Sequence, residues 1–125
     1  MRLTQITPFV PCTDLEQQIR FYSGILGFEV GFKAENYAFL HRDQIAVRLV
    51  EVWKDVDLAH PERQGSFYID VEDIDAVFED MKPKLDTLPN GRVRAPFNQD
   101  YGQREFHVHD EDCTLIFFGQ AVRTG

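Results

Sequence analysis

The sequence predicts an α+β fold built from two tandem βαβββ modules. Each half of the chain shows the pattern of one strand, one helix and then three short strands. The 125 residues, of which 43% are hydrophobic, suffice for one domain whose core needs neither a disulfide nor a metal. We therefore expect a single domain over residues 1–125, composed of a module of residues 1–60 and a module of residues 61–125.

The strands of the first module are predicted from runs of apolar and aromatic residues. Residues 3–12 form the first run, where Pro8 and Pro11 favour a sheet edge or a hinge because proline has no N–H group for an interior ladder. A polar linker containing Pro61 closes the module at residues 54–64. Three further stretches, rich in aromatic and branched residues, predict a meander of strands at residues 28–33, 37–42 and 45–53.

The first helix is predicted from a change to helical periodicity. Thr13 or Asp14 is a suitable N-cap, and Gly24 or Gly27 is expected to end the helix. The apolar residues at helical spacing are Leu15, Ile19, Tyr22 and Leu26.

The second module repeats this order. Residues 66–71 predict a strand, residues 73–82 a helix, and residues 82–91 a loop that contains two prolines. The remaining strands are predicted at residues 93–98, 104–110 and 114–119.

An alignment of the two halves supports an internal repeat. Asp14 aligns with Asp73 at an offset of 59 residues. The third strands, residues 37–43 and 104–110, align at an offset of 67, and the fourth strands align at an offset of 69. The growing offset indicates insertions in the loops of the second module, where extra length is tolerated.

Composition excludes several classes of partner. The chain has 13 Lys and Arg against 21 Asp and Glu, a net charge of −8, so nucleic acid is not an expected partner and cations are attracted. The sequence shows no signal peptide or membrane span, and we expect a cytoplasmic protein without a membrane partner. Cys12 and Cys113 form no CxxC pair, and we interpret both as thiols outside a disulfide.

Four segments resemble the vicinal oxygen chelate superfamily, which includes glyoxalases, extradiol dioxygenases and bleomycin-resistance proteins. These segments are residues 7–28, 37–43, 67–75 and 101–119. The resemblance implies the glyoxalase/bleomycin-resistance fold, in which two tandem βαβββ modules form a cleft. The final turn departs from the family pattern, because Cys113 stands at a position that often has a positive φ.

Metal-dependent members of this superfamily hold a divalent ion with one ligand from the first and one from the fourth strand of each module. The corresponding residues here are Thr7, Arg48, Ser66 and Phe117. Arginine repels a cation and phenylalanine has no lone pair, so we expect no metal, no cofactor and no catalytic residue.

One alternative is a metal site formed by His107 and His109, which share a strand face, with a carboxylate such as Glu51. That site would belong to a lyase, isomerase or dioxygenase. The other interpretation of the two histidines is a pair of imidazoles that line a groove or face solvent beside an acidic turn.

The chain is closest in character to the bleomycin-resistance branch, whose members resemble it in being small, acidic and free of metal. The resemblance implies a homodimer, with an N-terminal strand exchanged near Pro8 and Pro11, that sequesters a cationic antibiotic. An unrelated small metabolite is the alternative ligand. The expected ligand-binding residues, for each of which core packing is the alternative, are Phe32, Tyr37, Phe39, Trp53, Phe97 and Tyr101.

Overall fold

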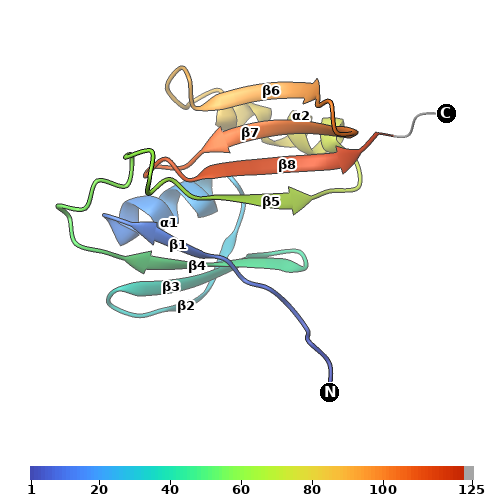
Figure 1. Cartoon of the computed structure of the whole chain (residues 1–125). Coiled ribbons are helices and arrows are strands. Elements are labelled where there is room, and N and C mark those ends of the chain that lie inside the picture. Colours follow the sequence, from blue (N-terminus) through green and yellow to red (C-terminus); the bar gives the residue numbers. More distant parts are fainter. Residues whose placement is uncertain (123–125) are drawn as a thin grey trace. The chain divides into compact units, whose positions relative to one another are not determined.

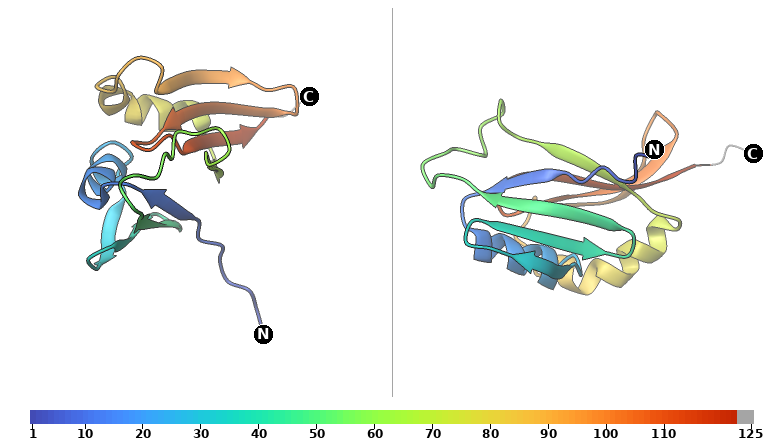
Figure 2. Two further views of the ribbon diagram at one scale, coloured as in Figure 1. Left: turned by 60° about the vertical axis from the view of Figure 1, so that its left-hand side comes forward. Right: turned by 90° about the horizontal axis from the view of Figure 1, so that it is seen from below.

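The computed structural model describes residues 1–122. The chain divides into two compact units, Met1–Arg63 and a second that begins at Gln64. In each unit a four-stranded sheet carries one helix on one face (Figures 1 and 2). Neither helix of the described residues is long and apolar enough to cross a membrane.

The first unit has the predicted βαβββ order. Its sheet has the strand order β1-β4-β3-β2, in which β1 is parallel to β4 and the other pairs are antiparallel. The elements are β1 Phe9–Cys12, α1 Leu15–Gly24, β2 Glu29–Lys33, β3 Tyr37–Arg42 and β4 Ile45–Glu51.

The second unit repeats this topology in the strand order β5-β8-β7-β6, with β5 parallel to β8. The prediction of two βαβββ modules is therefore confirmed. The elements are β5 Ser66–Asp70, α2 Ile74–Leu85, β6 Val93–Asn98, β7 Gln103–His109 and β8 Leu115–Ala121.

Two predicted boundaries are wrong. Strand β1 begins only at Phe9, so residues 3–8 are not part of the sheet. Helix α2 continues through Pro83 to Leu85, although residues 82–91 were predicted as a loop. Proline removes one helical hydrogen bond there, but burial of the Leu85 side chain, which is 3% exposed, favours the extra turn.

Each core lies between a helix and the sheet of the same unit. In the first unit Tyr22 of α1 is fully buried and meets the ring of Phe28 edge-on. In the second, Phe106 of β7 stacks on Phe118 of β8 with ring centroids 4.6 Å apart, and Phe78 of α2 packs on Phe106 at 5.1 Å. These contacts account for the apolar periodicity of both helices.

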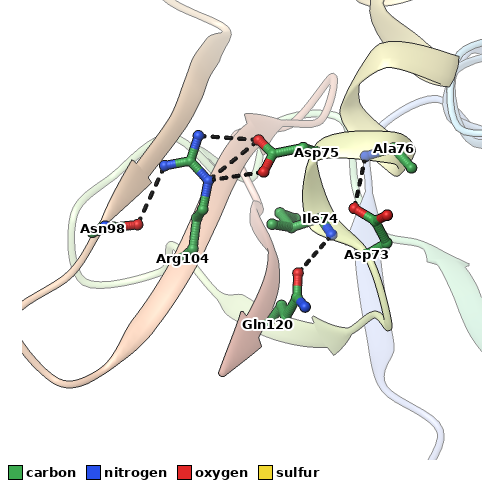
Figure 3. Close-up of polar contacts among 7 residues, drawn as sticks. All are labelled: Asp73, Ile74, Asp75, Ala76, Asn98, Arg104 and Gln120. Atoms are coloured by element: carbon green, nitrogen blue, oxygen red, sulfur yellow. Dashed lines mark hydrogen bonds and ion pairs between the residues drawn. The ribbon is translucent and has the colours of Figure 1, made fainter. Parts of the chain in front are cut away.

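Both helices are anchored to the fourth strand of their unit in chain order, β4 or β8. The side chain of Glu51 at the end of β4 accepts a hydrogen bond from the Leu15 N–H at 2.9 Å. In the second unit Gln120 of β8 accepts one from the Ile74 N–H, also at 2.9 Å (Figure 3). Asp14 and Asp73 act as N-caps by accepting from an N–H group of the first turn.

A salt bridge adds to the anchoring of α2. Arg104 of β7 donates from Nη2 to Asp75 at 3.0 Å and also reaches Asn98 of β6 (Figure 3). The contact ties the first turn of α2 to two strands of the sheet.

The final hairpin turn has the unusual backbone predicted for it. Cys113 adopts a φ of 70°, in the left-handed region. The buried Asp110 carboxylate accepts from the N–H groups of Asp112 and Thr114 at 2.9 and 3.0 Å, which holds the turn closed. Neither Cys12 nor Cys113 takes part in a disulfide within residues 1–122.

Gly119 of β8 allows an aromatic ring to lie directly on the second sheet. A Cβ atom at this position would overlap the ring and hydroxyl of Tyr68. The Tyr68 ring instead stacks on Phe117 with centroids 5.8 Å apart and planes 20° apart, and its hydroxyl bonds to Gln103 at 3.0 Å. Glycine is thus required by the close approach of Tyr68 to the backbone.

We predict that Glu51→Ala lowers the free energy of unfolding by about 1–2 kcal/mol, because the first N–H group of α1 loses its partner. Chemical denaturation measures the change. Glu16→Ala is the matched control, since this exposed carboxylate on α1 pairs with Lys33 at the surface, and we expect a loss of about 0.5 kcal/mol or less. Equal losses would contradict the anchoring role of Glu51.

We predict that Gly119→Ala destabilises the protein by about 1–3 kcal/mol, because the new methyl group displaces Tyr68. In a Tyr68→Ala background the same substitution is expected to cost less, which a double-mutant cycle of unfolding free energies measures. Gly24→Ala is the control, since a Cβ there has nothing within 4 Å. Full additivity of the Gly119 and Tyr68 changes would contradict the overlap.

Candidate functional site

The candidate site consists of side chains on the sheet face that the helix of the same unit does not cover, which we call the helix-free face. Alternation along a strand places them there. Val47 and Leu49 of β4 are buried beneath α1, so Arg48 between them points to the helix-free face. Phe39 of β3 projects to the same side, as its register partner is Arg48.

The first unit presents the Arg48 patch, defined as Phe32, Tyr37, Phe39 and Arg48. The Arg48 guanidinium lies over the Phe39 ring, 5.0 Å from its centroid, and donates a hydrogen bond to the Tyr37 hydroxyl. Phe32 packs on Tyr37 with centroids 6.1 Å apart and remains 59% exposed. Gly31 leaves the space that the Phe39 ring occupies next to β2.

Three of the predicted ligand-binding residues, Phe32, Tyr37 and Phe39, therefore come together in one patch. Trp53 does not join them. It lies beyond Glu51, the last residue of β4, with 82% of its surface exposed. Its exposure is consistent with a role in contacting a ligand and argues against core packing.

The second unit presents the Glu105 cluster, defined as Tyr68, Gln99, Tyr101, Glu105 and His107. Glu105 of β7 is fully buried. Its Oε2 accepts from the Tyr101 hydroxyl at 2.6 Å, and its Oε1 accepts from Gln99 Nε2 at 3.0 Å and from His107 Nε2 at 2.7 Å. The carboxylate thereby holds Gln99 and Tyr101, both in the loop between β6 and β7, against β7.

The surroundings of Glu105 keep it ionised. Burial alone would raise the pKa of the Glu105 carboxyl, but hydrogen bonds from Tyr101, His107 and Gln99 outweigh it and lower this pKa. The same bond to Glu105, together with burial, raises the pKa of Tyr101. Burial, followed by the interaction with Glu105, raises the pKa of Tyr68 strongly. The cluster therefore consists of one buried carboxylate and the side chains that donate hydrogen bonds to it.

Aromatic rings enclose His107. Its imidazole lies 4.3 Å from the Phe117 centroid and 5.1 Å from that of Phe97. The Arg94 guanidinium lies over the Phe97 ring, 3.5 Å from its centroid. The predicted residues Phe97 and Tyr101 are thus linked through His107 and Glu105.

Sequence reasoning missed Glu105 as a site residue because the third strands were aligned one residue out of register. Phe39 pairs with Arg48 and His107 pairs with Phe117, so the offset of the third strands is 68 and not 67. A shift of one residue exchanges the two faces of a strand. The alternation along β7 indicates the correct register. Phe106 and Val108 are its apolar residues on the helix side, so Glu105 and His107 lie on the helix-free face.

The residues at the family's metal positions do not fit a divalent ion. Thr7 and Ser66 offer one hydroxyl each, Arg48 carries a fixed positive charge, and Phe117 has no donor atom. No group of three His, Cys, Asp or Glu side chains within residues 1–122 is arranged to hold a metal. Glu51, the carboxylate of the alternative site, accepts the hydrogen bond that anchors α1.

Comparisons with known proteins agree with this fold. A bleomycin resistance protein of Geobacillus stearothermophilus is 27% identical to this chain, over 98% of this chain and 100% of the relative. The crystal structure of a bleomycin-binding protein complexed with bleomycin matches with a TM-score of 0.81 at 23% identity, over 94% of this chain and 98% of that one.

The fold is also shared with an enzyme. The structure of a lactoylglutathione lyase from Agrobacterium tumefaciens matches with a TM-score of 0.70 at 17% identity, over 95% of both chains. The fold alone therefore does not select between binding and catalysis. The family model for the "Glyoxalase/Bleomycin resistance protein/Dioxygenase superfamily" matches residues 2–117, and the chain belongs to this superfamily.

Proposed function

We propose that this protein binds a bleomycin-type antibiotic stoichiometrically and leaves it chemically unchanged. The observation that carries the proposal is the chemistry of the helix-free faces. Aromatic side chains occupy them, while the family's metal positions hold Thr7, Arg48, Ser66 and Phe117. The full-length similarity to bleomycin resistance proteins supports the same ligand class.

Aromatic stacking supplies the contact energy in this proposal. Exposed aromatic rings bury a large apolar area against a flat heteroaromatic ligand. Phe32, Trp53 and Tyr101 are 59%, 82% and 60% exposed, so each has surface left for such contact. The net charge of −8 attracts a cationic ligand from a distance and raises its rate of association.

We also propose that the protein acts in the cytoplasm as a homodimer. Residues 1–7 lead away from β1 as an extended segment outside the strands, whereas the Pro8 carbonyl still accepts a hydrogen bond from the Arg48 N–H at 3.0 Å (Figure 1). Leu3, Ile6 and Phe9 are 104%, 93% and 68% exposed. An apolar segment next to the edge strand β1 is suited to pairing with a second copy of the chain, with Pro8 at the hinge and Pro11 within β1.

We predict that dialysed protein binds metal-free bleomycin with a dissociation constant in the micromolar range or tighter. Isothermal titration calorimetry measures this, and mass spectrometry of the recovered ligand is expected to show an unchanged mass. Phe32→Ala is expected to weaken binding several-fold, because the exposed ring of the Arg48 patch is removed.

Val30→Ala is the matched control for Phe32→Ala. Val30 is an exposed apolar residue of the same edge strand, but its partner Leu40 is buried under α1, so it faces the helix side. We expect this variant to bind as the parent does. Chemical modification of the ligand would contradict the proposed function. So would a stoichiometric bound metal without which the ligand does not bind.

We predict that the double substitution Leu3→Glu, Ile6→Glu shifts the protein from dimer to monomer. Two charges on the extended segment oppose its burial against a second copy. Analytical ultracentrifugation measures the mass in solution. Two results would refute the exchanged segment: a parent protein that is monomeric at all concentrations, or a variant that stays fully dimeric.

A further inference from the structure

We propose that the Arg48 patch is a binding site for a planar conjugated carboxylate. The guanidinium of Arg48 takes the carboxylate, and the exposed ring of Phe32, beside Tyr37, takes the flat conjugated system. This inference rests on the proposed function only in that it uses the same helix-free face for a ligand. It assigns to that face a second, anionic class of ligand beside the cationic antibiotic.

The first observation is the missing counter-ion of Arg48. Three other arginines pair with carboxylates at 3.0 to 3.9 Å: Arg42 with Asp43, Arg92 with Glu111 and Arg104 with Asp75. Within residues 1–122 the contacts of the Arg48 guanidinium are instead the Tyr37 hydroxyl and the Phe39 ring, both neutral. A half-buried positive charge without an anionic partner, in a chain of net charge −8, is a position where an anion from outside is stabilised.

The second observation is that the guanidinium is already held in place. Arg48 lies in the middle of β4, between two buried residues, so its backbone is fixed by the core. The Tyr37 hydroxyl accepts from one terminal nitrogen, and the Phe39 ring supports one side of the group. Because a guanidinium has five N–H donors, donors remain for the two oxygens of a carboxylate.

The third observation is the aromatic surface beside the charge. Phe32 packs on Tyr37 and keeps 59% of its surface exposed. A flat conjugated ring stacks on such a surface, while its carboxylate lies in the plane of the ring and meets the planar guanidinium. A cationic group is repelled from the same position, so the patch discriminates by charge as well as by shape.

Three naphthalene probes of similar size and different charge test this inference: 2-naphthoate, 2-naphthamide and 2-naphthylmethylammonium. Each is titrated into the full chain by calorimetry at low ionic strength. We expect 2-naphthoate to bind about tenfold or more tightly than the amide, and the ammonium probe to bind weakest. Equal affinities, or a preference for the ammonium probe, would overturn the proposal.

Arg48→Gln is expected to abolish the preference for 2-naphthoate, and Arg48→Lys to retain only part of it, because lysine lacks the planar fork. Arg20→Gln is the control. It changes the net charge equally, but Arg20 is exposed on α1, on the covered side of the sheet. A thermal unfolding scan verifies that each variant is folded. An unchanged preference in folded Arg48→Gln would also overturn the proposal.

Bleomycin titrations of the same proteins separate the two proposals. A chain that prefers 2-naphthoate through Arg48 but does not bind bleomycin supports the carboxylate site and refutes the proposed function. A chain that binds bleomycin but shows no charge preference among the probes refutes the carboxylate site alone.

Discussion

Each four-stranded sheet is covered by a single helix, and this constraint determines the rest of the structure. One helix buries only one face of a sheet, so the alternation along every strand separates a core side from a helix-free side. The first turn of the helix is held by the fourth strand of its unit, through Glu51 of β4 in one unit and Gln120 of β8 in the other. The helix-free faces carry the side chains that do not pack against the helix.

The two units share the same strand and helix framework but differ in the side chains on their helix-free faces. Register places Arg48 of the first unit at the position of Phe117 in the second, Phe39 at that of His107, and Tyr37 at that of Glu105. One face therefore has a positive charge among aromatic rings. The other has a buried, hydrogen-bonded carboxylate among aromatic rings. The two faces therefore differ in charge although they share one framework.

The sequence predicts the framework well because helical and strand periodicity both follow from burial against the core. Asp14, one of the two predicted N-cap candidates, caps α1, and all eight predicted strands form. The network around Glu105 is not predictable in the same way, because it depends on register and on a hairpin loop that brings Gln99 and Tyr101 back to β7. The extension of α2 through Pro83 likewise depends on a tertiary contact, the burial of Leu85.

The central claim is that the helix-free faces bind the ligand without a metal. Backbone and side-chain chemical shifts of metal-free protein, followed during addition of bleomycin, test it most directly. The claim predicts that the largest changes fall on the Arg48 patch, the Glu105 cluster and the Trp53 indole, while the exposed sides of α1 and α2 stay unchanged. Changes confined to the helices, or no changes until a divalent metal is added, would contradict it.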